Sequence, residues 1–128
     1  MHNFTYAFTA WEGDFVSCDV VKQAYELNVA PVTVQGGKLD ASYLSVDNDN
    51  IVIDTVKLAE DGSGDIIVRL YESKKAAVTA NLYASIADGY KAYSCDMLEN
   101  VLEEIPVDNG AASLSFRAFE IKTIRLSV

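Results

Sequence analysis

The chain has 128 residues, of which half are hydrophobic and seven are tyrosine, a composition typical of one folded domain or two small packed β units rather than a disordered tail. Its formal net charge of −9 argues against nucleic acid and against an anionic membrane surface as partners, because both attract basic patches. No apolar run approaches the roughly 18 residues of a membrane span, and the first residues lack the features of a signal peptide, so we expect a cytoplasmic protein. Cys18 and Cys95 are then expected to be reduced thiols, with one disulfide as the alternative.

The first part of the chain predicts short strands and one helix. Aromatic and small residues alternate over 4–9, which is typical of a strand. Apolar residues near helical spacing then predict a short helix near residues 20–27, with Ser17 as its N-cap. Further short strands are expected at 32–34 and 42–46, before a turn rich in Asn and Asp.

The second part of the chain predicts regularly spaced strands with turns between them. Residues 97–104 are acidic and are expected to be irregular, whereas Asp108-Asn109-Gly110 is a strong hairpin signal. Alternation or β-branched content predicts strands at 51–58, 66–72, 78–86, 91–95 and 120–128. The predicted fold class is therefore all-β, an antiparallel β-sandwich with one short helix.

The strand predicted over 66–72 is the most informative segment of the chain. Ile66, Val68 and Leu70 fall on one face and predict burial there, while Arg69 lies on the mixed opposite face. An unpaired, partly buried arginine costs several kcal/mol, so we expect a carboxylate partner for Arg69.

The sequence contains no constellation that predicts catalysis or metal binding. His2 is the only histidine, and no close ligand spacing joins it to the two cysteines. The acidic stretches 47–50 and 61–65 lack the glutamate that closes an EF-hand calcium loop, so plain turns are favoured. Trp11 together with the tyrosines could form a sugar-stacking platform, although core edges and cross-strand pairs are the commoner use of such residues.

Several segments together carry a family resemblance. They are 2–7 (HNFTYA), 13–14 (GD), 20–28 (VVKQAYELN), 56–62 (VKLAEDG), 67–72 (IVRLYE), 100–103 (NVLE) and 119–126 (FEIKTIRL). In this order they resemble the extreme C-terminus of glycoside hydrolase family 38 alpha-mannosidases, the bacterial type especially.

The resemblance implies a fragment of a larger enzyme. Residues 1–48 would be the last strands of its large C-terminal β-sandwich, and 49–128 its small terminal β-sandwich domain. The catalytic domain of such enzymes is an N-terminal α/β barrel with a zinc ion, a nucleophilic aspartate and an acid aspartate. No position here matches those groups, so we predict no catalytic residue, cofactor or metal in this chain, and the hydrolysis of terminal alpha-mannosides with retention is expected only of the parent.

The role implied for this chain is support of the catalytic domain. Arg69, Tyr71 and Glu72 are the residues expected to face other domains of the same polypeptide or the active-site rim, and glycans would be reached only through the parent. A truncated chain could also self-associate through an uncovered apolar face. The alternative is an autonomous carbohydrate-binding module with Trp11 as its stacking residue; an enzyme in its own right is disfavoured by the missing histidines.

Overall fold

The computed structural model describes residues 2–37, 41–86 and 89–127. The chain divides into two compact units, Met1–Gly37 and Lys38–Val128, and each is described by itself. Val128, the last residue of the predicted closing strand, lies outside the described residues.

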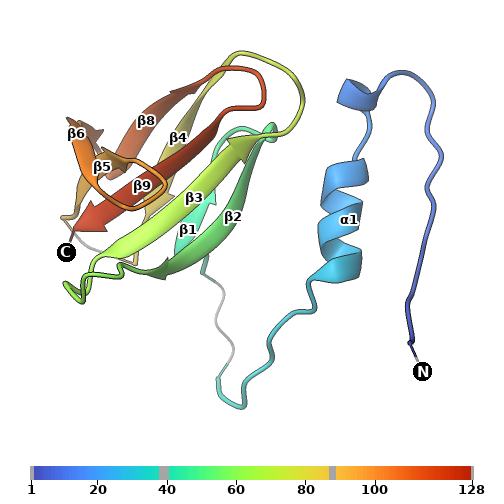
Figure 1. The fold of residues 1–128 in the computed structure, drawn as a ribbon, viewed down its shortest axis with the longest axis horizontal. Coiled ribbons are helices and arrows are strands. Elements are labelled where there is room, and N and C mark those ends of the chain that lie inside the picture. Colours follow the sequence, from blue (N-terminus) through green and yellow to red (C-terminus); the bar gives the residue numbers. More distant parts are fainter. Residues whose placement is uncertain (1, 38–40, 87–88, 128) are drawn as a thin grey trace. The chain divides into compact units, whose positions relative to one another are not determined.

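The first unit contains a 3-10 turn, η1 (Phe15–Ser17), and one helix, α1 (Val20–Asn28) (Figure 1). The helix predicted near residues 20–27 is therefore confirmed. Its N-cap is Asp19 and not Ser17, and the Asp19 side chain makes no capping hydrogen bond. Ser17 is unavailable as a cap because it closes η1, where its backbone N–H donates to the Asp14 carboxylate at 3.0 Å and its hydroxyl donates to the Asp14 carbonyl at 2.8 Å.

The strands predicted at 4–9 and 32–34 are not formed. Both stretches are irregular backbone, and no strand pairing of the described residues includes them. Alternation alone does not make a strand, because the backbone N–H and C=O groups also need a neighbouring strand edge.

The second unit is a sandwich of two antiparallel sheets (Figure 1), which confirms the predicted fold class. The four-stranded sheet runs in the order β1 (Leu44–Val46), β4 (Val78–Ala84), β8 (Ala111–Phe116), β7 (Val107–Asp108). The five-stranded sheet runs in the order β2 (Ile51–Leu58), β3 (Ile66–Glu72), β9 (Ile121–Ser127), β5 (Lys91–Cys95), β6 (Val101–Ile105).

The core lies between the inner faces of the two sheets. Side chains alternate along a strand, so Val68 and Leu70 of β3 both turn inward and are fully buried, with Ile66 partly buried against them. The predicted apolar face of this strand is therefore confirmed. Ile124 and Leu126 of the neighbouring strand β9 are buried beside them. The buried side chains from the four-stranded sheet are Ala80, Leu82, Ala112, Leu114 and Phe116.

The acidic segment 97–104 differs from its prediction in its second half. Val101–Ile105 forms β6, which pairs only with β5 and is therefore an edge strand. An edge strand has one free side and tolerates charged residues there, so the acidity that argued against a strand is compatible with this one. The predicted hairpin at 108–110 is present, with Asn109 and Gly110 at φ angles of 50° and 77°, the left-handed pair that a tight hairpin turn requires.

The predicted division of the parent's domains between residues 48 and 49 concerns a longer polypeptide and stays a prediction. In this chain β1 pairs with β4, with Ser45 opposite Tyr83. It therefore belongs to the second unit.

Replacing Leu70 with Ala should lower the free energy of unfolding by about 2–5 kcal/mol, because the truncation leaves a cavity between the sheets. Urea denaturation followed by circular dichroism measures the change. The matched control is Leu102→Ala on β6, where the side chain is 67% exposed and the change should stay within about 0.5 kcal/mol. Equal effects of the two substitutions would contradict this placement of the core.

Candidate functional site

The outer face of the five-stranded sheet gathers cations from three neighbouring strands. Lys57 of β2 and Arg125 of β9 both lie opposite Ile67 of β3 in the strand register. Arg69 follows on the same face of β3, between two threonines. Three positive charges on one sheet face repel one another unless acids are supplied from outside the sheet.

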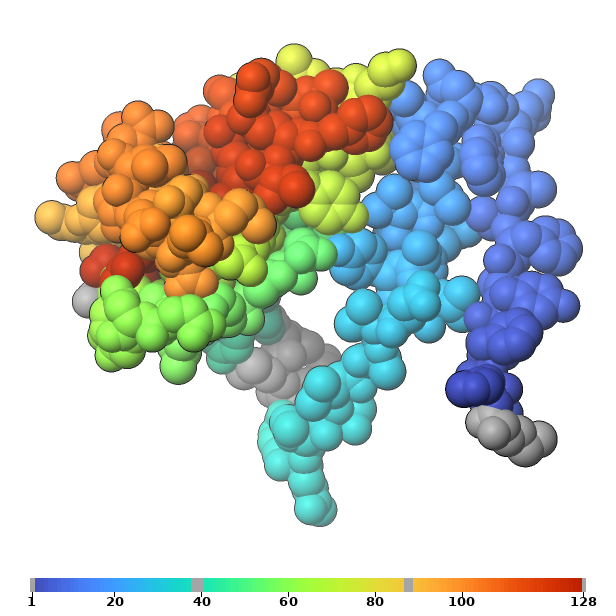
Figure 2. All heavy atoms as spheres, viewed as in Figure 1, coloured from blue at the N-terminus to red at the C-terminus, as the bar shows by residue number. Residues whose placement is uncertain are grey.

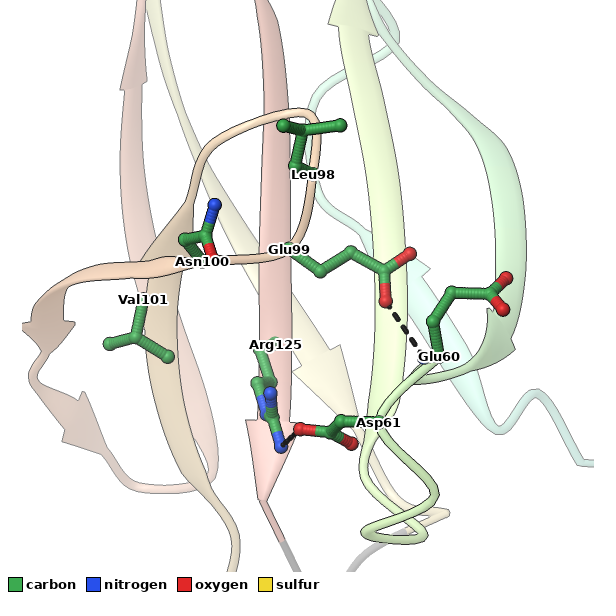
Figure 3. A pocket seen from close by; sticks show the side chains of 7 residues that line it. All are labelled: Glu60, Asp61, Leu98, Glu99, Asn100, Val101 and Arg125. Atoms are coloured by element: carbon green, nitrogen blue, oxygen red, sulfur yellow. Dashed lines mark hydrogen bonds and ion pairs between the residues drawn. The ribbon is translucent and has the colours of Figure 1, made fainter.

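The loop between β5 and β6 supplies one of these acids. The Asp96 carboxylate shapes the loop by accepting the N–H groups of Leu98 and Asn100 at 2.8 and 3.0 Å. Glu99 then has a φ of 70°, and its side chain extends from the loop toward Glu60 (Figure 3). In the space-filling view the orange segment that contains this loop lies on the viewed face, next to the light-green segment that contains the turn between β2 and β3 (Figure 2).

Glu99 is the centre of the charge cluster on this face. Its carboxylate lies 2.8 Å from Lys57 Nζ and 3.6 Å from Arg69 Nη2, and it accepts the backbone N–H of Glu60 at 3.0 Å. The Lys57 ammonium first, and then the Glu60 N–H, hold the pKa of Glu99 below its usual value. The side chain is 8% exposed, so this ion cluster is shielded from solvent on one side.

Arg69 has the carboxylate partner that the sequence predicts, since it pairs with Glu99. Its Nη2 also donates to the Met97 carbonyl at 3.3 Å, which joins the loop to β3. The Nε atom of Arg69 is buried without a hydrogen-bond partner. The known contacts of Arg69 are thus made within the second unit.

Arg125 is neutralised by the turn between β2 and β3. Its Nη2 lies 2.7 Å from Asp61 Oδ2 and donates to Ser63 Oγ at 2.9 Å, while its Nε donates to Asp65. Hydrogen bonds from Ser63, and then the Arg125 guanidinium, lower the pKa of Asp61 to about 2. Asp61 and Asp65 of this turn are therefore paired with Arg125.

An open depression of about 460 Å³ lies between this turn and the β5–β6 loop (Figure 3). Its lining residues are Glu60, Asp61, Leu98, Glu99, Asn100, Val101 and Arg125. In the described part of the chain no group of three or more histidine, cysteine or acidic side chains could hold a metal ion.

Glu72 is fully buried and joins two loops. Its carboxylate accepts the N–H of Lys74 at 2.7 Å and the N–H of Phe119 at 2.9 Å. Burial alone would raise the pKa of Glu72, but hydrogen bonds from Phe119, Lys74, Ala76 and Lys75 outweigh it and lower the pKa. The ionised carboxylate therefore fastens the β3–β4 loop to the β8–β9 loop.

The structure brings only some of the predicted site residues together. Arg69 and the half-buried Tyr71 share the outer face of β3, whereas Glu72 uses its carboxylate inside the sandwich. Trp11 belongs to the first unit, is 45% exposed, and donates from Nε1 to the Asp14 carbonyl at 3.1 Å. The roles proposed for these residues in a rim or in sugar stacking stay predictions.

Sequence reasoning missed Glu99, the residue that organises the outer face. Its partners Lys57 and Arg69 are 42 and 30 residues away in the chain, so no local spacing links them. The only local signal is Asp96 four residues before Asn100, a pair whose side chains hydrogen-bond at 2.8 Å. That pair predicts an ordered turn, but it does not predict which residues of the sheet the turn contacts.

The fold and the paired charges define an antiparallel β-sandwich domain with a charged outer face. Residues 50–124 match the family model of the glycosyl hydrolases family 38 C-terminal beta sandwich domain. The chain belongs to this family, as the resemblance predicts.

Two curated relatives extend the similarity to nearly the whole chain. Alpha-mannosidase G of Dictyostelium discoideum is 32% identical over 133 residues, which cover 97% of this chain and 12% of that protein. Alpha-mannosidase 2C1 of Mus musculus is 28% identical over 98% of this chain and 13% of its own length. The chain therefore spans about one eighth of the length of these relatives. Separately, none of its described helices is long and apolar enough to cross a membrane.

Replacing Lys57 with Met should raise the pKa of Glu99 toward the ordinary glutamate value, because the substitution removes the ammonium that contributes most to the shift. A carbon-detected NMR titration of the Glu99 carboxyl measures it. Lys91→Met is the matched control, since Lys91 is exposed and is not among the partners of Glu99. An unchanged Glu99 pKa in Lys57→Met would contradict the cluster.

Replacing Glu72 with Gln should destabilise the domain at neutral pH by about 1–3 kcal/mol, because one carboxylate acceptor becomes an NH₂ donor facing backbone N–H groups. The folded-state pKa of Glu72 lies below its ordinary value of 4.5. The ionised side chain therefore stabilises the fold above about pH 4.5, and this stabilisation is lost as the pH falls through the folded-state pKa.

Urea denaturation at several pH values tests this. The difference between the wild type and Glu72→Gln should shrink in acid, whereas the exposed control Glu103→Gln should match the wild type throughout. A difference that is constant with pH would rule out the ionised carboxylate as its source.

Proposed function

We propose that this chain is the C-terminal β-sandwich part of an alpha-mannosidase, and that it supports the catalytic domain without taking part in the chemistry. The observation that carries the proposal is that this chain matches only a small part of each of the two relatives. Both are named alpha-mannosidases, and each matches at least 97% of this chain with about an eighth of its own length. The hydrolysis of terminal alpha-mannosides would then belong to the longer polypeptide.

The state of the buried acids supports a structural role. A glycosidase needs one carboxylic acid that is protonated near neutral pH, so its pKa must be raised. Glu72 and Glu99 are the buried acids of the described chain, and their pKa values are both lowered. Both side chains therefore stay ionised at neutral pH, and they fit a structural role in which they bind loop N–H groups and neighbouring cations. The zinc ion that the family resemblance implies would be held by the parent's catalytic domain, and we assign no residue of this chain to it.

The outer face of the five-stranded sheet is our candidate for the surface that meets the catalytic domain. Arg69 and Tyr71 lie on it at intermediate exposure, and the β5–β6 loop adds Leu98 at 83% exposure. A charged cluster rimmed by exposed apolar residues is typical of contacts between domains of one polypeptide. Glu72 would contribute indirectly, by fastening the two loops at one end of β3.

The chain alone should not hydrolyse p-nitrophenyl alpha-mannoside, whereas the longer polypeptide that contains it should. The rim role is tested in that polypeptide with Arg69→Ala, which should lower kcat/KM because the face no longer meets its neighbour correctly. The matched control is Arg117→Ala, whose side chain is 86% exposed.

Three outcomes would count against parts of this proposal. Turnover by the chain alone would contradict a non-catalytic role. Unchanged kinetics with lowered stability in Arg69→Ala would remove the rim role and leave only internal pairing. Saturable NMR shifts around Trp11 on titration with mannose would favour the carbohydrate-binding module.

A further inference from the structure

The two-residue turn between β7 and β8 consists of an asparagine followed by a glycine. Asn109 is the only asparagine of the chain that precedes a glycine, and both turn residues are exposed. Within the described residues the Asn109 side chain has no hydrogen-bond partner, and no backbone hydrogen bond uses the Gly110 N–H. The side-chain amide and the following backbone nitrogen are therefore not held apart by other interactions.

These two groups can react with each other without an enzyme or a cofactor. The Gly110 nitrogen loses its proton to water or hydroxide and bonds to Cγ of Asn109, while the Cγ–Nδ2 bond breaks and ammonia leaves. The product is a five-membered succinimide ring. Glycine favours this attack because it has no Cβ that would crowd the approaching atoms.

Water then opens the ring at one of its two carbonyl carbons. Cleavage of the new bond between the Gly110 nitrogen and Cγ leaves an aspartate at position 109 on an unaltered backbone. Cleavage of the bond between that nitrogen and the original backbone carbonyl leaves an isoaspartate. In the isoaspartate the main chain runs through the side chain of residue 109, so it is longer by one methylene. Both products add one negative charge.

Tyr90 ties this turn to the core of the sandwich. Its side chain is 6% exposed, and its hydroxyl donates to the Gly110 carbonyl at 3.1 Å, with the Leu82 carbonyl at 3.4 Å. Burial raises the pKa of Tyr90, so the hydroxyl remains a donor at mildly alkaline pH. Ring closure rotates the peptide between Asn109 and Gly110, so it requires a local opening in which Tyr90 releases the carbonyl.

We propose that Asn109 is a site of spontaneous covalent modification, that the hydrogen bond from Tyr90 to Gly110 limits its rate, and that the isoaspartate product unfastens the β7–β8 hairpin. The inference is independent of the proposed function, because every step uses residues of this chain and water alone.

The hairpin is sensitive to this change because its pairing is short. Only two residue pairs join β7 to β8, Val107 with Ala112 and Asp108 with Ala111. A two-residue turn needs two residues in the left-handed conformation, and a backbone lengthened by one methylene does not fit it. The Gly110 carbonyl then moves away from Tyr90, so a change at the surface removes a hydrogen bond from a buried side chain.

Other positions of the chain lack this combination. Asp61 also precedes a glycine, but its pKa is lowered to about 2, and an ionised carboxylate is a poor target for a nitrogen nucleophile. Asn100 precedes the β-branched Val101, and its amide donates to the Asp96 carboxylate at 2.8 Å. These two sites therefore serve as internal controls for Asn109.

Incubation of the chain at mildly alkaline pH tests the site, with peptide mass spectrometry that distinguishes aspartate from isoaspartate. Asn109 should be converted at least about 10-fold faster than Asn100, because Asn100 must first break its hydrogen bond to a carboxylate. Asn109→Gly should remove the product and keep the fold, since two glycines also fit this turn. Similar conversion at the two asparagines, or none at Asn109, would overturn the proposal.

A matched pair of tyrosine variants tests the control by Tyr90. Tyr90→Phe keeps the buried ring and removes its hydroxyl, so conversion of Asn109 should become roughly 2- to 10-fold faster, the factor expected for one hydrogen bond. Tyr93→Phe makes the same chemical change on β5, opposite Glu104, and should leave the rate unchanged. An unchanged rate in Tyr90→Phe would contradict the limiting role of this hydrogen bond.

Urea denaturation tests the effect on the hairpin. The added charge allows ion-exchange chromatography to separate the modified chain, and the isoaspartate form should unfold at a lower urea concentration than the wild type. Asn109→Asp is the matched control, because it has the same charge on an unaltered backbone and Asp-Gly also fits the turn. Its midpoint should stay close to that of the wild type. Equal midpoints for the isoaspartate form and Asn109→Asp would show that the hairpin tolerates the longer backbone and would overturn this part of the proposal.

Discussion

The burial of apolar side chains between two sheets is the constraint on which the rest of the second unit depends. Val68 and Leu70 of β3 and Ile124 and Leu126 of β9 are fully buried there, and burying each such side chain contributes roughly 1.5–3 kcal/mol. Because side chains alternate along a strand, this burial also fixes the residues that must face outward. The core therefore determines which residues lie on the outer face. Because Val68 and Leu70 point inward, Arg69 between them must point outward.

The charges of the outer face follow from that placement. The core directs cations from three adjacent strands to one surface, and two irregular segments supply the acids that neutralise them. Glu99 comes from the β5–β6 loop, while Asp61 and Asp65 come from the turn before β3. Lowered pKa values keep Glu99 and Asp61 ionised, so the cluster fixes loops in position and is poorly suited to proton transfer. These features support the structural role that we propose for the domain.

The elements that the sequence predicts well are those with a local cause. The alternation in 66–72, the pair Asn109-Gly110 and the helical spacing after Val20 each carry their own signal, and all three are present. The misses have non-local causes. Residues 4–9 have the alternation of a strand but no neighbouring edge in the described structure, and the acids near Val101 obscured an edge strand that β5 pairs. The partnership of Glu99 with Lys57 and Arg69 joins distant segments, so only the folded chain brings it together.

The central claim is that the sandwich is a self-sufficient unit with its own core, whereas the described residues of the first unit form no strand and leave most of their large apolar side chains exposed. Trp11 is the only tryptophan and lies in the first unit, so its fluorescence reports that unit while far-UV circular dichroism reports mainly the strands. The direct measurement is urea denaturation of the whole chain followed by both signals. The account predicts one cooperative transition in circular dichroism and a gradual, non-coincident change in Trp11 fluorescence. Coincident cooperative transitions in the two signals would contradict it.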